Sequence, residues 1–528
     1  LLPGLPLRGF AIGRGLLWLL FSIIAWYLTS LGAGFFWTQS GIWLLVAVWV
    51  VLNAVVLFLR RRELLQYVRD HWRALALAEL LFVGMLALGL SLRAVNPDLW
   101  NVGRGGEKPM DFAYLNAVLR TPTFPPPNPW LADFEINYYY FGFVIAALPI
   151  KLAGVASEIG YNLALGTLYA GIFMIFYVIS HALLPPMRAL WKALLALVGS
   201  LLAMVAGNLG TLQLLLAPEP NMDPHRWYWY PTRVLGESAN RAGGAINEIP
   251  LFSFLFGDLH AHVVALLPTT LMLLTMIVMV RTRRLWTFAL LGILAGTILM
   301  TNTWDVLLYV PLGALAVWLA SRDLHRFVRN GIIVSAAGIL TIAPFYLNFS
   351  SGAANGLDWW NGERSLIEPW LIVWGIPLGI AFFWLLHRAR ACFFPGVRAP
   401  LELGILGLAL VAILAPIPSV ATSALCVLLI ALAALLAWRD EPEHRLVHAS
   451  IALVVGVLLL IEYIVVRNDV GRMNTVFKLS FQLWVWLALI IPIIVSIGFG
   501  WLLLADALLL WAAGAPGQVL WVTFIRET

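Results

Sequence analysis

The sequence has little charge and almost no cysteine. Of its 528 residues only 11% are charged, whereas 62% are hydrophobic; a typical globular domain has about 25% charged residues. The two cysteines, Cys392 and Cys426, lie in or beside apolar runs, which excludes a disulfide framework and a cysteine metal site. The sequence also lacks internal repeats, low-complexity tracts, a C-x-x-C-H haem motif and a polar stretch long enough for a separate soluble domain. It therefore predicts an all-α polytopic membrane protein.

Long apolar runs give an approximate topology. A membrane-spanning helix needs about 20 mostly apolar residues. Fifteen candidate runs occur, near residues 11–30, 40–59, 74–94, 138–155, 163–184, 189–217, 260–280, 286–303, 304–320, 331–349, 369–386, 401–416, 419–438, 447–465 and 480–504. Three of them lie between loops 95–137 and 218–258, but a return to the same side requires an even number, so we expect about 14 true spans. Arg188 and Lys192 favour 138–155 as the exception, while GNLG at 207–210 equally favours a break in the third run.

The basic residues indicate which loops face inward. The formal net charge is +6, and its basic residues cluster in short loops such as RRRELLQYVRDHWR (60–73), RTRR (281–284), RDLHRFVR (322–329) and HRARACFFPGVR (387–398). This is the positive-inside pattern of a multi-pass protein in the plasma (inner) membrane, and it argues against a nucleic acid partner. Counting from these loops places the amino terminus inside and loops 95–137, 218–258, 302–305, 350–368 and 466–479 outside. Because the sequence begins at Leu1 without methionine, the first run is not interpreted as a cleaved signal.

The predicted outer loops hold most residues with catalytic chemistry. In FSFLFGDLHAHVVALL, LMTNTWDVLLY and VRNDVGRMNTVFKLSFQLW, ionisable residues stand at the edges of apolar runs. An unpaired charge there costs several kcal/mol, so such residues are candidates for function. The candidate site comprises Glu107, Asp111, Tyr138, Tyr139, Asp258, His260, His262, Asn302, Trp304, Asp305, Arg467, Arg472, Asn474 and Lys478, with Asp133 and Glu135 as a candidate metal pair.

Loop 95–137 contains two pairs of carboxylates. Asp111 follows Glu107 by four residues, so a short helix would place both on one face, as general base chemistry or a divalent cation requires. Helix capping or pairing with Lys108 is the structural alternative. Asp133 and Glu135 form a D-x-E sequence, and extended backbone would direct both carboxylates to one side.

Two further motifs allow more than one interpretation. In GDLHAH (257–262), a helix would align Asp258 with His262, whereas an extended segment would align both with His260. Two imidazoles and a carboxylate suit a metal or proton-transfer site, and equally a buried hydrogen-bonded cluster. The tyrosines at 138–140 suit an aromatic belt at the membrane surface or the lining of a site.

The segment before the last span supplies three cations, Arg467, Arg472 and Lys478. Arginine can bind a phosphate through two parallel hydrogen bonds, and lysine adds a point charge. Snorkelling to the membrane surface is the structural alternative, although it is more usual on the inner side.

Five motifs, in order, resemble a known family. EKPMDFAYLNAVLR, INYYYFG, FSFLFGDLHAHVVAL, TNTWD and GRMNTVFKLSFQLWV, within residues 74–500, resemble the YYY-motif membrane proteins of Chloroflexi and archaea, whose function is unassigned. The arrangement is also similar to GT-C-class membrane glycosyltransferases, in which a long first outer loop carries the catalytic acid. That likeness implies a GT-C-like transmembrane domain at 74–528, preceded by an amino-terminal helical pair at 1–73. Because no D-D or D-E pair stands beside Asp111, Asp133 and Glu135 compete with it for the acid's position.

The GT-C likeness implies transfer of a sugar from a polyprenyl-phosphate donor at the outer face. Asp111 would act as general base, Arg472 and Lys478 would neutralise the leaving lipid phosphate, and His260 or His262 would orient the substrate or move a proton. The candidate cofactor is a divalent metal. Two other classes stay open: a subunit or scaffold of a larger membrane complex, with membrane protein partners, and a transporter, for which matching broken halves are not visible.

Overall fold

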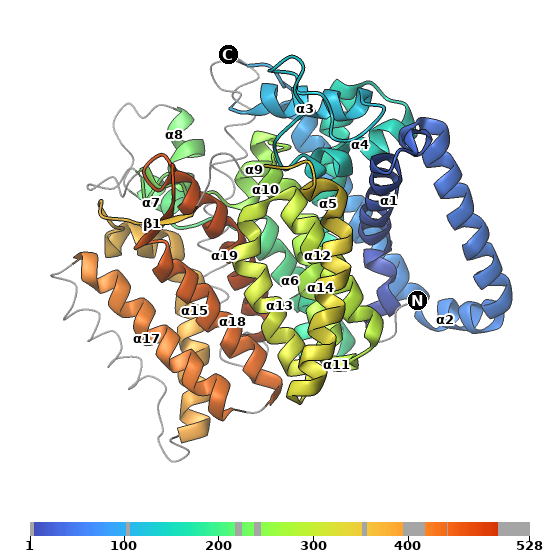
Figure 1. Ribbon diagram of the computed structural model, residues 1–528. Helices are drawn as coiled ribbons and strands as arrows, with labels where there is room; N and C mark the ends of the chain where they lie inside the picture. Colours follow the sequence, from blue (N-terminus) through green and yellow to red (C-terminus); the bar gives the residue numbers. More distant parts are fainter. Residues whose placement is uncertain are drawn as a thin grey trace. The chain divides into compact units, whose positions relative to one another are not determined.

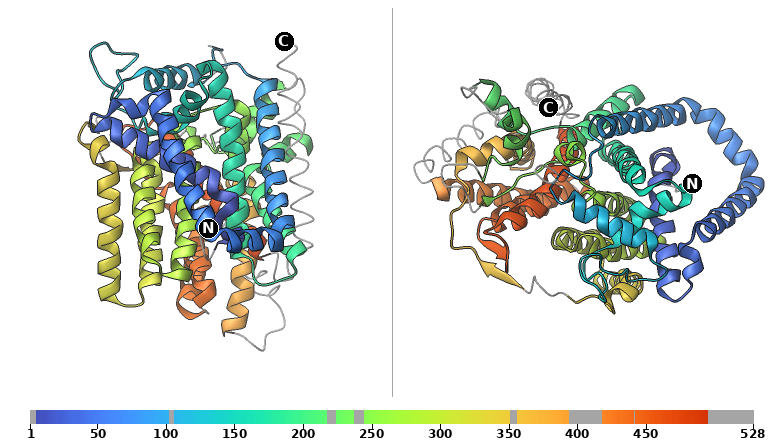
Figure 2. Two further views of the ribbon diagram at one scale, coloured as in Figure 1. Left: turned by 90° about the vertical axis from the view of Figure 1, so that its right-hand side faces the viewer. Right: turned by 90° about the horizontal axis from the view of Figure 1, so that it is seen from above.

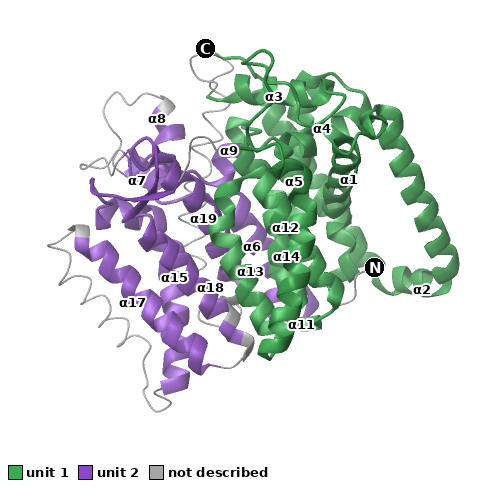
Figure 3. Cartoon of the chain, in the orientation of Figure 1, with its two compact units in different colours: residues 1–182, 254–351 green, residues 183–253, 352–528 purple. Residues whose placement is uncertain are grey.

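The computed structural model describes residues 5–101, 106–216, 224–236, 244–350, 356–393, 418–440 and 442–494. Within these ranges the chain is mostly helical, with one two-stranded sheet, which confirms the all-α class. Nine of the described helices are long and apolar enough to cross a membrane, as expected of a multi-pass membrane protein. The chain divides into two compact units, residues 1–182 with 254–351 and residues 183–253 with 352–528 (Figure 3).

The first unit is a helical bundle with a buried centre. Its described elements are η1 (Pro6–Ile12), α1 (Gly13–Ser30), η2 (Gly34–Trp37), α2 (Gln39–Val95), α3 (Lys108–Arg120), α4 (Phe141–Ala153), α5 (Ser157–Leu183), α10 (Ala261–Val264), α11 (Leu266–Thr282), α12 (Leu285–Thr301), η5 (Thr303–Asp305), α13 (Val306–Ser321) and α14 (Leu324–Tyr346). The most apolar windows of α10–α11 and α5 are 94% and 83% buried, whereas those of α2 and α14 are 6% and 11% buried. Hence α5 and α11 form the core, and α2 and α14 offer apolar side chains to lipid.

Helix α2 joins two of the predicted spans. It has 57 residues, or about 85 Å of helix against about 30 Å of bilayer hydrocarbon. Its ribbon descends, turns at the lower end and rises again, so runs 40–59 and 74–94 are two arms of one bent helix (Figures 1 and 2). The expected loop 60–73 is helical, and the boundary after residue 73 falls inside α2. The basic turn lies at the end of this unit opposite α3, in agreement with the positive-inside prediction (Figure 1).

The second unit centres on α19 (Met473–Ile494), whose apolar window is 89% buried. Its other described elements are α6 (Ala189–Met204), α7 (Gly210–Leu216), α8 (Pro224–Trp229), η3 (Tyr230–Thr232), α15 (Ile367–Phe393), α17 (Pro418–Arg439), α18 (Pro442–Leu460) and the strands β1 (Leu357–Trp359) and β2 (Ile464–Val466). The two strands pair antiparallel, with Leu357 opposite Val466. Helix α9 (Pro250–Phe256) contains the boundary between the units.

Three details refine the predicted spans. Run 189–217 is broken at GNLG, where α6 ends at Met204 and α7 begins at Gly210, and run 138–155 forms only the short helix α4. Helix α19 begins at Met473, so the expected outer loop 466–479 is shorter than predicted. The predicted span at 401–416 lies outside the described residues.

Candidate functional site

The short helix α3 carries Asp111 into the interior of the first unit. Pro109 stands at its start, where proline's fixed φ is favourable and no amide donor is needed. The residues Lys108, Asp111, Leu115 and Val118 form one buried stripe at helical spacing, and Asp111 is completely buried. Asp111 therefore faces the core although it lies in the first turn of a helix at the end of the bundle.

A tight non-helical loop places His260 beneath α3. Gly257 has φ +76, and a side chain there would occupy the position of the Arg93 guanidinium. The Tyr161 hydroxyl donates to the Gly257 carbonyl at 3.2 Å and accepts from the Leu259 amide at 2.9 Å. Gly257 and Tyr161 thus fix the loop backbone just before α10 begins at Ala261.

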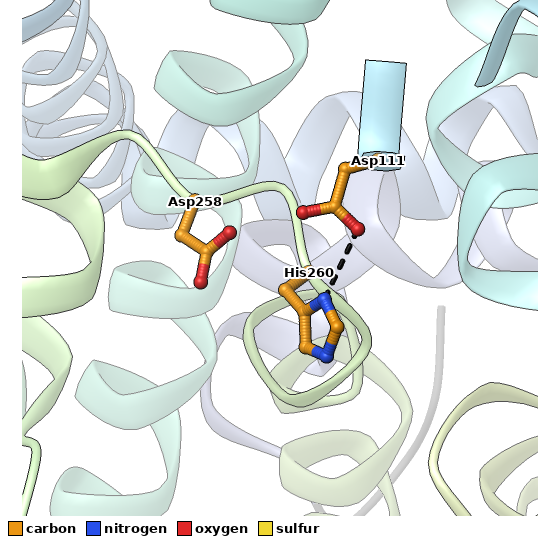
Figure 4. Close-up of side chains that lie close together, drawn as sticks. All are labelled: Asp111, Asp258 and His260. Carbon is orange, nitrogen blue, oxygen red and sulfur yellow. Dashed lines mark hydrogen bonds and ion pairs between the residues drawn. The ribbon is translucent and has the colours of Figure 1, made fainter. Parts of the chain in front are cut away.

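The centre of the site is a hydrogen-bonded series from Asp111 through His260 to Tyr138. His260 Nδ1 lies 3.0 Å from Asp111 Oδ1, and His260 Nε2 lies 3.3 Å from the Tyr138 hydroxyl (Figure 4). Burial, chiefly, raises the pKa of Tyr138 well above its ordinary value, so its hydroxyl stays protonated. In the neutral imidazole, Tyr138 then donates to Nε2 and Nδ1–H donates to Asp111. His260 and Asp111 are both buried, so the contact between them is shielded from water.

Two more carboxylates lie close to His260. Glu107 Oε2 is 3.5 Å from Nδ1, on the same side of α3 as Asp111, as the spacing of four residues predicts. Asp111, Asp258 and His260 each offer one ligand atom, and these atoms lie within 4.8 Å of one another (Figure 4). Two carboxylate oxygens and an imidazole nitrogen are a donor set that divalent metals accept.

The other histidine of GDLHAH lies on a different element. His262 is on α10, buried, with its ring centroid 5.5 Å from that of His260. Because the loop is extended and α10 is helical, neither of the two alignments expected from the sequence describes the whole motif. Asp258 associates with His260 rather than forming a helical pair with His262.

The three tyrosines have separate partners. Tyr138 contacts His260, whereas the buried Tyr140 hydroxyl accepts a hydrogen bond from the Trp26 indole at 3.3 Å. Burial raises the pKa of Tyr139 to about 12, and hydrogen bonds with Tyr138 and Trp304 partly oppose that rise. Tyr140 is therefore part of the interior of this unit, whereas Tyr138 and Tyr139 are partly exposed.

The TNTWD motif joins the same cluster through Tyr139. Asp305 is completely buried and close enough to act on the Tyr139 hydroxyl electrostatically. Asn302 is also completely buried, and its side-chain amide has no hydrogen-bond partner among the described residues. Both residues belong to the turn between α12 and α13, as the predicted outer loop 302–305 requires.

Two cations near this cluster were not predicted as site residues. Arg93, at the end of α2, is buried and donates to the Asn162 side chain at 2.8 Å and to the Leu255 carbonyl at 3.5 Å. The pKa of Lys108 falls to about 8, chiefly through burial and secondly through nearby Arg93, although Asp258 acts in the opposite direction. For Arg93, the sequence did contain a signal, because an ionisable residue at the end of an apolar run is a candidate for function.

The predicted cations near residue 470 belong to the second unit. Arg472 is completely buried, donates to Glu462 Oε2 at 2.7 Å and to the Ser365 hydroxyl at 2.8 Å, and is therefore part of an internal ion pair. Arg467 pairs with Asp358 across β1 and β2 at the surface. Lys478 is buried on α19, with its ammonium over the Phe477 ring.

Asn474 has a local role at the start of α19. The Asp469 carboxylate accepts hydrogen bonds from the Asn474 amide and side chain and from Thr475. This arrangement satisfies donors in the first turn of the helix. It explains why α19 starts before the apolar run.

The D-x-E argument for a metal pair is wrong in its premise. Asp133 has φ +64, which is left-handed and not extended, so the alternation of an extended strand does not apply. Asp133 and Glu135 are both exposed. Among the described residues, the group with metal-ligand geometry is Asp111, Asp258 and His260.

Comparison with known proteins gives one family. Neither a search of the curated proteins nor a search of the solved structures found a match. A family model described as an uncharacterized membrane protein (DUF2298) matches residues 20–487, a range that includes every site residue named above. The chain therefore belongs to the DUF2298 family of uncharacterized membrane proteins.

Proposed function

We propose that the protein is a membrane glycosyltransferase that moves a sugar from a polyprenyl-phosphate donor to an acceptor hydroxyl, with Asp111 as general base. The observation that carries the proposal is the series Asp111–His260–Tyr138, in which Asp111 and His260 are buried. A base needs a carboxylate held in one orientation and shielded from water, and a neutral imidazole that donates to it supplies that orientation. Helix α3, which carries Asp111, lies at the end of the unit opposite the basic turn of α2 (Figure 1), and this supports chemistry at the outer face.

The proposed reaction is a single displacement. Asp111 removes the proton from the acceptor hydroxyl, whose oxygen forms a bond to the anomeric carbon of the sugar. The bond from that carbon to the phosphate oxygen breaks, and its electron pair leaves with the lipid phosphate. One displacement inverts the anomeric configuration. His260 holds the Asp111 carboxylate, and Tyr138 holds the opposite nitrogen of the imidazole.

A divalent cation fits the same donor set. Asp111, Asp258 and His260 would hold it, and it would offset the negative charge of the donor phosphate when bound. With the cation bound, His260 would present the lone pair of Nδ1 to it and donate from Nε2–H to Tyr138, so Tyr138 would still hold the imidazole.

The test follows the release of lipid phosphate from labelled polyprenyl-phosphate sugars by the purified protein. Asp111→Asn keeps the size of the side chain and removes the base, so we expect turnover to fall by about a hundredfold or more. Asp133→Asn, a change at an exposed aspartate of the same loop, should leave turnover unchanged.

Each other outcome identifies an alternative. Equal release by wild type and Asp111→Asn would remove Asp111 as base. Loss of release in Asp133→Asn alone would transfer that role to Asp133. No release with any donor would favour a subunit or scaffold of a membrane complex, and movement of the donor across a vesicle membrane without bond cleavage would favour a transporter.

A further inference from the structure

The first unit contains a groove that the acid–base site does not use. Its volume is about 710 Å³, within the range of about 300–1,000 Å³ usual for small-molecule sites. The end of α2 contributes Leu90 and Arg93, the following loop contributes Trp100, and the start of α5 contributes Ile159, Asn162 and Leu163. We call this feature the α2–α5 groove.

The groove begins beside a close crossing of the two helices. A methyl group on Gly89 would lie 3.0 Å from the Gly166 carbonyl oxygen, so the two backbones are nearly in contact there. About one turn farther along, Arg93 on α2 and Asn162 on α5 face each other across a 2.8 Å hydrogen bond. The larger side chains at this level separate the helices and leave room for a ligand.

The groove has an apolar, exposed side. Ile159 and Leu163 on α5 are exposed, and so is Trp100 in the loop after α2. The neighbouring arm of α2 presents further exposed apolar residues, including Leu80, Val83 and Leu88, as expected of a surface in contact with lipid. An acyl or prenyl chain could enter the groove from the bilayer, and Trp100 is a suitable residue for the membrane surface.

The inner side of the groove is cationic. Arg93 is a buried wall residue, and it is close enough to Lys108 for the two charges to interact. Lys108 lies one helical turn before Phe112, another wall residue, and Asp258 is within electrostatic range of its ammonium. Glu158 at the exposed rim is the acidic residue of the lining. Apolar walls that lead to two cations are complementary to a lipid with an anionic phosphate.

We propose that the α2–α5 groove binds the lipid chain of a polyprenyl phosphate and that Arg93 and Lys108 bind its phosphate. The identity of this lipid as the sugar donor's carrier rests on the proposed function. The assignment places the phosphate near Asp258 and His260, within the same unit as the base. It also replaces Arg472, which pairs with Glu462, as the phosphate ligand.

The experiment uses a polyprenyl phosphate with a photoreactive group in its chain, bound to the full-length protein in nanodiscs. After irradiation, peptide mapping identifies the labelled segments. We expect label on residues 90–100 and 158–163, and competition by unlabelled polyprenyl phosphate but not by polyprenol or phosphatidylglycerol. Leu163→Trp should fill the groove and reduce labelling at least tenfold, whereas Leu88→Trp, at a similarly exposed position outside the lining, should not change it. Lys108→Gln should reduce affinity by about 10- to 100-fold, as for loss of a charged hydrogen bond.

The outcomes separate this proposal from the proposed function. Labelling that survives Leu163→Trp, or maps elsewhere, would overturn the groove assignment even if sugar transfer is observed. Equal competition by phosphatidylglycerol would overturn the polyprenyl ligand in favour of a general phospholipid. Labelling that follows the expected pattern in a wild-type protein that transfers no sugar would support the groove and contradict the transferase.

Discussion

Replacing Tyr138 with phenylalanine tests whether the tyrosine motif contributes to chemistry or only to packing. The substitution removes one hydroxyl, which lies 3.3 Å from His260 Nε2. Leaving a buried acceptor without its donor costs about 1–3 kcal/mol, and each 1.36 kcal/mol is a factor of about ten in rate. If the imidazole orients the Asp111 carboxylate, we expect turnover to fall by about 5- to 160-fold.

The adjacent tyrosines provide matched controls. Tyr140→Phe removes a hydroxyl that accepts from Trp26, so it should lower stability by about 1 kcal/mol and leave turnover unchanged. Tyr139→Phe should lower turnover less than Tyr138→Phe, because the Tyr139 hydroxyl bonds to Tyr138 and Trp304 and acts on His260 only through Tyr138. The assay combines initial rates of sugar release with thermal unfolding in the same detergent. A Tyr138→Phe variant with full turnover and the same loss of stability as Tyr140→Phe would refute the proposed positioning role.

Four further outcomes follow from the structure. Gly257→Ala should lower stability by about 1–3 kcal/mol in a thermal unfolding assay, because its φ is positive and Arg93 fills the space. Glu462→Gln should lower it by about 3–5 kcal/mol, because Arg472 keeps its buried charge. Below pH 8, Lys108→Met should unfold at a higher temperature than wild type. The pKa of Lys108 is about 8 in the folded state against an ordinary 10.5, through burial first and Arg93 second, so its charge costs the wild type about 3 kcal/mol while both states are protonated. That difference should disappear as pH rises from 8 to 10.5. Chelation followed by readdition of Mn²⁺ should abolish and restore turnover if Asp111, Asp258 and His260 hold a cation.

The apolar runs of the sequence predicted most of the helices, because a membrane-spanning helix can be recognised from its length and hydropathy alone. The runs at 163–184, 286–303 and 419–438 correspond to α5, α12 and α17. Two boundaries depended on other signals. The basic segment 60–73 contains no proline or glycine and many good helix formers, so α2 continues through it. Helix α19 starts early because Asp469 caps its first turn, although the apolar residues begin later.

The gathering of site residues was more predictable than their pairing. Charge patterning placed Asp111, His260 and Asp305 on one side, and the structure brings all three to one end of the first unit. Which carboxylate contacts which imidazole depended on the turn at Gly257 and on the Tyr161 hydroxyl far away in sequence. No local periodicity contains that information. The same limit applies to Arg472, whose partner Glu462 lies in a segment without any motif.

The charge balance of the site explains why its cations matter. Asp111 and Asp258 contribute two formal negative charges, and Arg93 and Lys108 contribute two positive ones, so these groups balance with His260 neutral. Glu107 is left out of this sum because its side chain is 64% exposed and water screens its charge. A phosphodiester donor would add one negative charge. Buried charge without compensation costs several kcal/mol, so a bound cation or a proton on one carboxylate would favour binding of the donor. A proton on Asp111 would remove the base, whereas a divalent cation at Asp111, Asp258 and His260 would leave the carboxylates ionised. For the proposed transfer, a cation is therefore the counter-charge that is compatible with Asp111 as base.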